Sequence, residues 1–435
     1  MPARALPGFR EFYPEEISLR NHIFAAWRNV ARRYGFEEYD GPPLEPLELY
    51  TEKSGPEIVG QLYEFVDKGQ RRVALRPEMT PTLARMVGAR AASLKKPIRW
   101  YSIPQLFRYE RQQRGRLREH FQLNMDIIGE PGPLADAEII GAAIDVQRAL
   151  GLGPEDVRVR ISDRRVLRCL LLGAGVPEED LTATFMAIDR VGRVQNVAEL
   201  IEKALEHAPE DRTAIAKRVL EIASIRDRGR LEKALGDVGA GSVAEGLLDC
   251  LDALRAMGFE EFVDLDLSIV RGLAYYTGIV FELFDAQQSL RAICGGGRYD
   301  GLLGALGGAD LPAVGFGMGD VVLGELIKEK NLLPSKRAAL DVFIVAVTGA
   351  DMPEVLALAR ELRDAGIAVE YPLRLQSVAK QLKLAAAREA RWAVIVGPEE
   401  RSEGKILLRD LASGSEEKVG REALLQRLGT VTAGK

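Results

Sequence analysis

Residues 100–129 read WYSIPQLFRYERQQRGRLREHFQLNMDIIG. Two strand-like runs lie on either side of the charged loop 110–116, a pattern that predicts a β-hairpin. Alternation in the second run places one set of side chains on one face, Phe121, Leu123, Met125 and Ile127, and another set on the opposite face, Gln122, Asn124 and Asp126. The apolar face predicts burial. The polar face is either exposed to solvent or lines a polar pocket.

Upstream of this hairpin, residues 14–34 carry apolar side chains at helical spacing, and Gly35 is a suitable glycine C-cap. The next segment contains Gly41-Pro42-Pro43, which cannot continue a helix and suits an extended chain at a sheet edge or an interface. Downstream, residues 176–257 are rich in Ala, Leu, Glu, Lys and Arg and have few strand signals. They predict a helical insertion in a sheet-based domain, because strand signals return at 262–284.

The pattern changes after a polar, proline-containing segment at 328–337. Strand-like and helix-like segments then alternate at 341–347, 353–365, 367–371, 377–390 and 392–396. This βαβαβ order predicts a small three-layer domain with a largely parallel sheet. We therefore expect a first domain at 1–330, a linker at 331–338 and a second domain at 339–435.

Composition narrows the class of protein. The 435 residues are 47% hydrophobic and 28% charged, as in globular proteins, and the length predicts two or three domains. A net charge of −5 argues against a general nucleic-acid binder but permits a local basic patch. The three cysteines and three histidines are too scattered for a disulfide framework, a zinc site or a Ser/His/Asp triad. No apolar run has the length of a membrane span and the start lacks a signal-peptide pattern, so we expect a cytoplasmic protein.

Four short segments carry side chains suited to phosphate or polar-ligand chemistry. In the first hairpin run, Arg108 and Glu110 share a face. An arginine held on a strand can present a bidentate fork to a phosphate, and a glutamate can accept a hydrogen bond from an exocyclic amine. The alternative is a surface ion pair. A second segment, Arg-Pro-Glu-Met-Thr at 76–80, forms a compact polar cluster after the strand-like residues 72–75.

The other two segments lie later in the chain. Residues 267–276 place Arg271, Tyr275 and Tyr276 after a strand, although such tyrosines are commonly ordinary sheet residues. Residues 295–301, Gly-Gly-Gly-Arg-Tyr-Asp-Gly, predict a turn. This glycine run lacks the strand–turn–helix context and the later acidic partner of a dinucleotide-binding fingerprint, which argues against a Rossmann dehydrogenase.

Together the segments at 76–80, 107–110, 271–276 and 296–300 resemble the signatures of histidyl-tRNA synthetases. The resemblance runs nearly end to end, and residues 396–411 are similar to the family's anticodon-binding domain. It implies an α+β class II catalytic core, an antiparallel sheet flanked by helices with a helical insertion, followed by an α/β anticodon-binding domain. It also implies a homodimer with Pro42 at the interface. The last two segments are specific to histidyl enzymes and their close paralogues.

The resemblance also implies roles for individual residues. Arg108 and Arg271 would be catalytic and contact the α-phosphate of ATP, Glu110 the adenine amine and Arg116 the outer phosphates. The implied histidine-binding residues are Glu78, Met79, Thr80, Arg108, Gln122, Asp126, Arg271, Tyr275 and Tyr276. The implied contacts to the tRNA acceptor end are Gln112, Gln113 and Arg114. Lys380 and Lys383 are candidate anticodon contacts, or alternatively a solvated helix face.

The implied reaction joins histidine to ATP and then to tRNA(His), with Mg²⁺ bridging the phosphates and no dedicated metal cage in the protein. Two positions depart from the family pattern. Residues 319–322, Gly-Asp-Val-Val, have Val322 where the third motif normally ends in an arginine that stacks on adenine, and Ala274 replaces a common Asp. These departures leave open a histidine-binding regulatory subunit of histidine biosynthesis that does not charge tRNA. Such paralogues typically lack the anticodon domain that this chain keeps.

Overall fold

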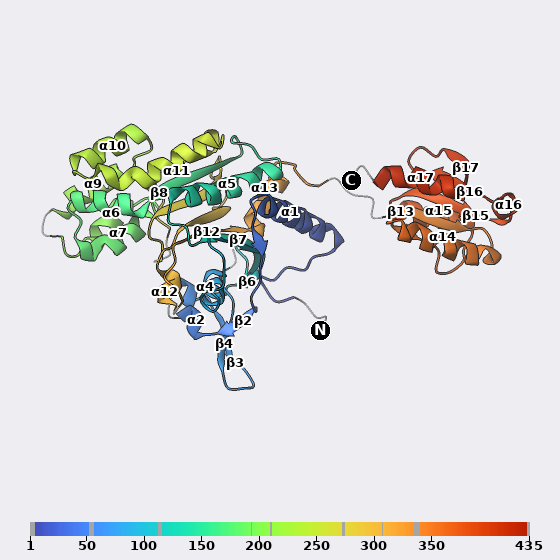
Figure 1. Ribbon diagram of the computed structural model, residues 1–435, viewed down its shortest axis with the longest axis horizontal. Helices are drawn as coiled ribbons and strands as arrows, with labels where there is room; N and C mark the ends of the chain where they lie inside the picture. Colours follow the sequence, from blue (N-terminus) through green and yellow to red (C-terminus); the bar gives the residue numbers. More distant parts are fainter. Residues whose placement is uncertain are drawn as a thin grey trace. The chain divides into compact units, whose positions relative to one another are not determined.

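The computed structural model describes residues 5–51, 56–111, 115–192, 194–208, 211–271, 275–306, 308–334 and 340–432. Two compact units make up the chain, Met1–Leu333 and Pro334–Lys435. Each unit has its own sheet and is considered separately (Figure 1).

The first unit is built on a mixed sheet. Its strands lie in the order β1 (Glu37–Glu38), β5 (Ile98–Ser102), β7 (Glu119–Ile128), β12 (Ala313–Gly319), β11 (Cys294–Arg298), β10 (Ile279–Asp285), β8 (Val157–Asp163) and β9 (Val263–Leu265). The pairs from β5 to β8 are antiparallel, and the edge pairs β1–β5 and β8–β9 are parallel. A further strand, β6 (Gln105–Phe107), pairs with β7 and completes the hairpin predicted from residues 100–129.

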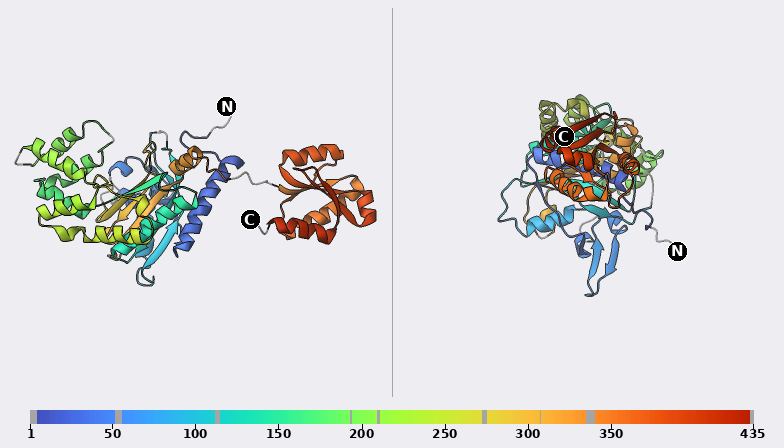
Figure 2. Two further views of the ribbon diagram at one scale, coloured as in Figure 1. Left: turned by 90° about the horizontal axis from the view of Figure 1, so that it is seen from above. Right: turned by 90° about the vertical axis from the view of Figure 1, so that its right-hand side faces the viewer.

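Helices cover the apolar face of this sheet. On β7 the side chains of Leu123, Met125 and Ile127 are buried in the main hydrophobic core, as the alternation predicts. The same core includes residues of α1 (Pro14–Arg33), α5 (Pro133–Ala149) and α13 (Asp320–Glu329), which lie side by side along the sheet (Figure 2). The polar face of β7 is therefore directed away from these helices.

A helical insertion separates β8 from β9. It comprises α6 (Arg164–Gly173), α7 (Leu181–Ile188), α8 (Val197–Ala204), α9 (Arg212–Ala223), α10 (Arg228–Asp237) and α11 (Glu245–Ala256). These helices gather at one end of the sheet (Figures 1 and 2), and α6 to α9 share a second hydrophobic core. The helical prediction for residues 176–257 is confirmed. Within the described ranges no helix has the length and apolar character needed to cross a membrane.

A small second sheet positions the polar segment 76–80. It consists of β2 (Leu44–Pro46), β4 (Arg72–Leu75) and β3 (Tyr63–Val66), all paired antiparallel. The chain leaves β4, passes through residues 76–79 and enters α4 (Thr80–Gly88). The segment is thus a tight connection between a strand and a helix, where side chains can converge on a site.

The predicted glycine-rich turn at 295–301 is wrong over most of its length. Residues 294–298 form β11, a buried strand between β10 and β12. A Cβ on Gly296 would lie only 2.3 Å from the main-chain oxygen of Gly315 and 2.6 Å from Cβ of Phe316. Glycine is required here by close strand approach rather than by a turn. The chain turns only at Gly301, whose φ is +83°.

The second unit contains a mixed five-stranded sheet. Its strands lie in the order β14 (Val369–Glu370), β13 (Leu340–Ala346), β15 (Ala390–Val396), β16 (Lys405–Asp410) and β17 (Glu416–Gly420). The strands β14, β13 and β15 are parallel, as predicted. The prediction of a largely parallel sheet is nevertheless wrong, because β16 and β17 add an antiparallel hairpin.

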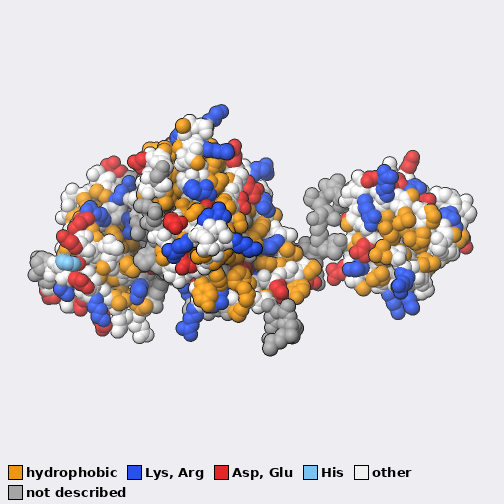
Figure 3. All heavy atoms as spheres, turned by 90° about the horizontal axis from the view of Figure 1, so that it is seen from below, with side chains coloured by type: hydrophobic (Ala, Val, Ile, Leu, Met, Phe, Trp, Pro, Cys, Tyr) orange, Lys and Arg blue, Asp and Glu red, His pale blue; other side chains and the backbone are white. Residues whose placement is uncertain are grey.

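Helices cover both faces of this smaller sheet, which confirms the three-layer prediction. The helices are α14 (Met352–Asp364), α15 (Val378–Ala387), α16 (Pro398–Glu403) and α17 (Arg421–Thr432). One core contains residues of α14 and α17, and a separate core contains residues of α15. On the face seen in Figure 3, hydrophobic side chains occupy the middle of this unit, and Lys and Arg side chains lie toward its margin.

Candidate active site

Two adjoining cavities lie on the polar face of the large sheet. The larger has a volume of about 730 Å³ and the smaller about 80 Å³. Five residues line both cavities: Arg108, Gln122, Arg271, Gly295 and Gly317. Arg108 and Gln122 come from the hairpin, Gly295 from β11 and Gly317 from β12. Together with Arg271 they assemble the centre of the site from distant parts of the chain.

The larger cavity concentrates positive charge. Among its described lining residues, arginines outnumber carboxylates; the arginines are Arg108, Arg116, Arg160, Arg226, Arg271 and Arg291, and the carboxylates are Glu110, Asp189 and Glu282. The whole chain has a net charge of −5, so this excess is local. A cavity lined by one sign of charge attracts ligands of the opposite sign. The larger cavity therefore suits a polyanion such as a nucleoside triphosphate.

The smaller cavity gathers most of the residues that sequence reasoning assigned to histidine. Its lining includes Glu78, Thr80, Arg108, Gln122, Asn124, Asp126, Arg271, Tyr275 and Tyr276. The polar face of β7 therefore lines a pocket rather than facing solvent, and the two tyrosines are pocket residues. Met79 is buried but lines neither of these cavities.

Asp126 is a buried acid in the smaller cavity. Its residue is 5% exposed, and the hydroxyl of Tyr299 donates a hydrogen bond of 2.6 Å to Oδ1. Burial raises the pKa of Asp126 to about 7, although the Tyr299 hydrogen bond opposes the rise. Sequence reasoning did not select Tyr299. Its signal was present, since Tyr299 lies two residues after the glycine run.

Glycines of β12 provide the space that the polar side chains of β7 occupy. The strands pair with Gly315 opposite Asp126 and Gly319 opposite Gln122. A Cβ on Gly315 would lie 2.0 Å from Oδ1 of Asp126, and one on Gly317 would lie 2.8 Å from the side-chain amide of Gln122. Larger residues at either glycine would displace the polar side chains that form the pocket.

Contacts of Glu78 and Pro77 connect the segment 76–80 to the rest of the site. The hydroxyl of Tyr275 donates to Oε2 of Glu78 at 3.5 Å, and the rings of Tyr275 and Tyr276 have centroids 4.9 Å apart. Nε of Arg108 donates to the carbonyl oxygen of Pro77 at 2.9 Å. This contact fixes one edge of the Arg108 guanidinium and leaves other donors for a ligand.

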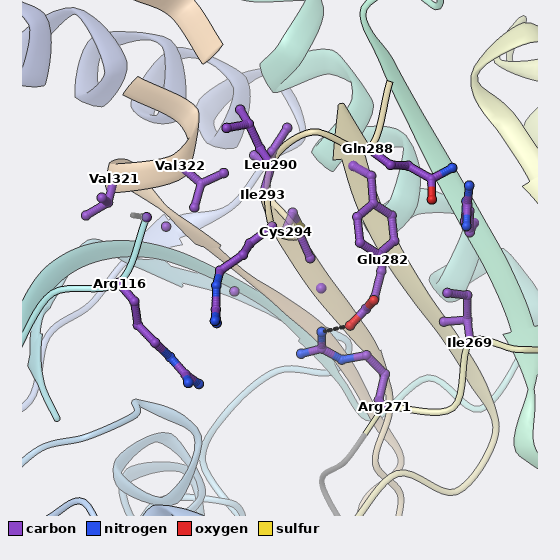
Figure 4. Close-up of a pocket in the computed structure, with 18 of the residues that line it drawn as sticks. Arg116, Ile269, Arg271, Glu282, Gln288, Leu290, Ile293, Cys294, Val321 and Val322 are labelled. Atoms are coloured by element: carbon purple, nitrogen blue, oxygen red, sulfur yellow. Dashed lines mark hydrogen bonds and ion pairs between the residues drawn. The ribbon is translucent and has the colours of Figure 1, made fainter. Parts of the chain in front are cut away.

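Arg271 lies where the two cavities meet. Its Nη1 contacts Oε1 of Glu282 at 2.6 Å, and Figure 4 shows the two side chains directed toward one another. The φ angle of Arg271 is +60°, an uncommon value for a residue with a side chain. Non-glycine residues in this region often mark functional sites, where the surrounding structure holds a strained backbone.

The other end of the larger cavity is more apolar. Figure 4 shows Leu290, Ile293, Val321 and Val322 close together, with Arg116 on the neighbouring wall. Arg116 forms an ion pair with Glu110. Sequence reasoning did not select Arg291, which also lines this cavity and had no motif to mark it.

His120 lies in the same wall as a neutral side chain. Burial, together with the charges of Arg108 and Arg10, lowers the pKa of His120 to about 3. Three predicted tRNA contacts, Gln112, Gln113 and Arg114, and the departure at Ala274 lie outside the described residues.

The residues present fit a magnesium ion that arrives with a nucleotide. The cavity carboxylates Glu110 and Glu282 each form an ion pair with an arginine, Arg116 and Arg271 respectively. Across the described part of the chain, no group of three or more His, Cys, Asp or Glu side chains is arranged to hold a metal ion. Phosphate oxygens and water are common magnesium ligands, so the nucleotide itself can supply the coordination.

Arg298, in the glycine-rich segment, does not line either cavity. It is 3% exposed and forms a buried ion pair with Asp136 of α5. Its Nη1 and Nη2 also donate to the carbonyl oxygens of Glu130 and Gly132, each at 3.1 Å. This arginine joins the sheet to the helix layer on the side opposite the site.

Comparisons with known proteins agree with this geometry. Residues 8–319 match the family described as histidyl-tRNA synthetase, and residues 341–430 match an anticodon-binding domain. The chain is 48% identical over 422 residues to histidine–tRNA ligase of Opitutus terrae, covering 96% of each protein. It is 42% identical over 409 residues to the chloroplastic/mitochondrial histidine–tRNA ligase of Arabidopsis thaliana, covering 94% of this chain and 83% of that protein.

Solved structures show the same fold. The crystal structure of histidyl-tRNA synthetase from a Nostoc species has a TM-score of 0.82 and 25% identity, covering 98% of this chain and 99% of that one. A Bacillus halodurans structure, described as an ATP phosphoribosyltransferase regulatory subunit/histidyl-tRNA synthetase, has a TM-score of 0.74. At 22% identity it shows the fold alone.

A mixed sheet flanked by helices, with a positively charged cavity on its polar face and a separate anticodon-binding domain, defines a class II aminoacyl-tRNA synthetase. The match to the family covers most of the chain, and the identity to its members extends over nearly the full length. The chain belongs to the histidyl-tRNA synthetase family.

Proposed function

We propose that the chain is a histidine–tRNA ligase that activates histidine with ATP and transfers it to tRNA(His). One observation carries the proposal: Arg108 and Arg271 line both cavities. A carboxylate held in the smaller cavity and a phosphate held in the larger one would meet at these two guanidinium groups. Arginine forks bind both kinds of oxyanion, so the junction suits attack of a carboxylate on a phosphate.

The smaller cavity would bind histidine. Glu78, Thr80 and Gln122 would receive the α-ammonium group, and Asp126 and Tyr276 would bond the two imidazole nitrogens, with Tyr275 beside them. The burial of Asp126 and Tyr276 supports this assignment, since an apolar side chain in the cavity would offer neither of these buried polar groups a hydrogen bond. A site that hydrogen-bonds its substrate in this way discriminates by about 10⁴-fold or more.

The larger cavity would bind ATP. Arg108 and Arg271 would contact the α-phosphate, Arg116 the outer phosphates and Glu110 the adenine amine. The ion pair between Glu110 and Arg116 would be exchanged for these two contacts when ATP binds. Val321 and Val322 would give the base an apolar wall, and Val322 stands where the family's third motif normally ends in arginine.

The proposed chemistry follows from these positions. An oxygen of the histidine carboxylate attacks the α-phosphorus, the bond to the β-phosphate oxygen breaks, and pyrophosphate leaves. Negative charge grows on the α-phosphate oxygens, and fixed guanidinium groups stabilise that charge more in the transition state than in the ground state. Bound Mg²⁺ would reduce the charge of the outer phosphates. The terminal ribose hydroxyl of tRNA then attacks the carbonyl carbon of histidyl-adenylate, and AMP leaves.

Several further assignments belong to the same proposal. The second unit would contact the anticodon; exposed Lys380 and Lys383 on α15, and the Lys and Arg side chains at the margin seen in Figure 3, support this. Residues 112–114 would contact the acceptor end. We also propose a homodimer with exposed Pro42 at its interface, and a cytoplasmic location.

Exchange between pyrophosphate and ATP tests this function. We expect the purified chain to catalyse exchange with histidine and not with the other amino acids, and to charge tRNA(His). Arg271→Ala should lower the rate of exchange by about 10²–10³-fold while changing histidine affinity much less. Arg99→Ala is a matched control, since Arg99 forms a 2.6 Å ion pair with Glu138 and lines neither cavity. Histidine binding without exchange would instead indicate a regulatory subunit.

A further inference from the structure

Glu282, in the middle of β10, has no part in the reaction as described. The residue is 5% exposed and lines the larger cavity. Its Oε1 accepts a hydrogen bond of 2.6 Å from Nη1 of Arg271. A carboxylate in a cavity meant for a polyanion would repel that ligand, so its presence there requires a reason. The ion pair with Arg271 supplies one.

The sheet register explains how Glu282 reaches Arg271. Glu282 pairs directly with Gly295 on the adjacent strand β11. A Cβ on Gly295 would lie 2.0 Å from Nη1 of Arg271 and 2.4 Å from Cζ. The guanidinium therefore lies against the bare backbone of Gly295, and the carboxylate of the neighbouring strand holds it there. Glycine provides the space, and glutamate provides the fixed charge.

Arg271 needs such support for two reasons. Its backbone has a φ of +60°, so the local chain does not favour this conformation by itself. Its side chain also shares both cavities with Arg108, another cation that is never deprotonated in proteins. A long arginine side chain with about 2 kcal/mol of rotamer entropy would otherwise move away from a like charge.

Other donors of the same guanidinium remain for a ligand. Nε of Arg271 is buried and makes no hydrogen bond within the described residues. A buried donor without a partner is uncommon in folded proteins and often marks a functional position. Nη1 would thus hold the side chain to the sheet, while Nε would be left for an oxygen of the substrate.

We propose that Glu282 is a positioning residue which, together with Gly295, fixes the guanidinium of Arg271 for contact with the α-phosphate. The inference rests on the proposed role of Arg271. Glu282 contacts no substrate in this scheme and acts through the arginine. The competing role is direct coordination of Mg²⁺ by the Glu282 carboxylate, which the test distinguishes by its dependence on magnesium.

Glu282→Gln is the central variant, because it keeps the shape of the side chain and removes its charge. We expect kcat for histidine-dependent exchange to fall by about 10²-fold, with smaller changes in the KM values for histidine and ATP. The Mg²⁺ concentration for half-maximal rate should stay unchanged. In an Arg271→Ala background, Glu282→Gln should cause little further loss, since the two residues act as one unit.

Further variants separate loss of the Glu282 charge from damage to the fold. Glu138→Gln removes the charge from the 2.6 Å Arg99–Glu138 pair outside the cavities, and we expect unchanged exchange. Glu282→Asp keeps the charge on a shorter side chain and should restore part of the rate. If Glu282→Gln fails to fold, Gly295→Ala keeps Glu282 in place and should lower kcat by obstructing the guanidinium.

The outcomes separate the inference from the function on which it rests. Normal kcat in Glu282→Gln, or losses that multiply fully with those of Arg271→Ala, would overturn the positioning role. A raised Mg²⁺ requirement would assign Glu282 to the metal instead. Absence of histidine-dependent exchange in the unaltered chain would overturn the proposed function itself, and normal exchange in Arg271→Ala would overturn the role of Arg271 on which the inference rests.

Discussion

Gly315→Ala offers a direct test of the histidine pocket. The added Cβ would lie 2.0 Å from Oδ1 and 2.7 Å from Cγ of Asp126, where ordinary contact begins at 3.4 Å. It would also lie 2.7 Å from the main-chain oxygen of Met125, which belongs to the neighbouring strand and cannot rotate away. The Asp126 carboxylate must therefore move by roughly 1 Å, a displacement that can cost about 10²-fold in rate.

We expect kcat/KM for histidine to fall by about 10²-fold in pyrophosphate exchange, with a much smaller change in KM for ATP. Overpacking of the strand pair should also lower the free energy of unfolding by about 1–3 kcal/mol, measured by urea denaturation. Gly324→Ala in α13 is the matched control. Its Cβ would meet only ordinary contacts at 3.8 Å, so kinetics should be unchanged and stability should rise by about 0.5–1 kcal/mol. A near-normal kcat/KM for histidine in Gly315→Ala would refute the assignment of Asp126 to the imidazole.

Three other predictions concern charge and domain organisation. Histidine affinity should rise as pH increases through about 7, because burial raises the pKa of Asp126 to about 7 and its carboxylate then ionises while the imidazole is neutral. Calorimetric titration should show a flatter pH profile for Asp126→Asn, and a histidine affinity that falls as pH rises in the unaltered chain would contradict the reasoning. Asp136→Asn should lower the free energy of unfolding by about 3 kcal/mol, because the buried Arg298 would keep only the partly exposed Asp300, 3.4 Å away, as a counter-charge; unchanged urea denaturation would disprove this. Truncation after Leu333, between the two compact units, should spare histidine-dependent exchange and weaken tRNA charging, and full charging would remove the tRNA role of the second unit.

Local pattern predicted the hairpin and the faces of its second strand. Alternation from Phe121 to Ile127 depends only on strand geometry. The structure confirms that Leu123, Met125 and Ile127 lie in the core, whereas Phe121 is only partly buried. The same pattern left the polar face open to two interpretations, solvent or pocket. The difference depends on Tyr299 and Arg271, which are more than a hundred residues away in sequence and reach the site only through the fold.

The wrong predictions have the same physical origin. Three consecutive glycines are typical of a turn, but those of β11 are required by the approach of Arg271 and of the backbones of β10 and β12. In the second unit, β17 is an exposed edge strand of charged residues, so it has no alternating apolar pattern to mark it. Neither the packing distance nor the strand partner can be inferred from local composition.

The neighbours Arg298 and Tyr299 face opposite sides of the large sheet, one toward α5 and the other toward the smaller cavity. Their loss would therefore produce defects of different kinds despite adjacent codons. A screen for conditional alleles should find changes at Arg298 among heat-sensitive mutants whose function returns on cooling. Changes at Tyr299 should give a stable enzyme with low activity, a defect that added histidine should relieve.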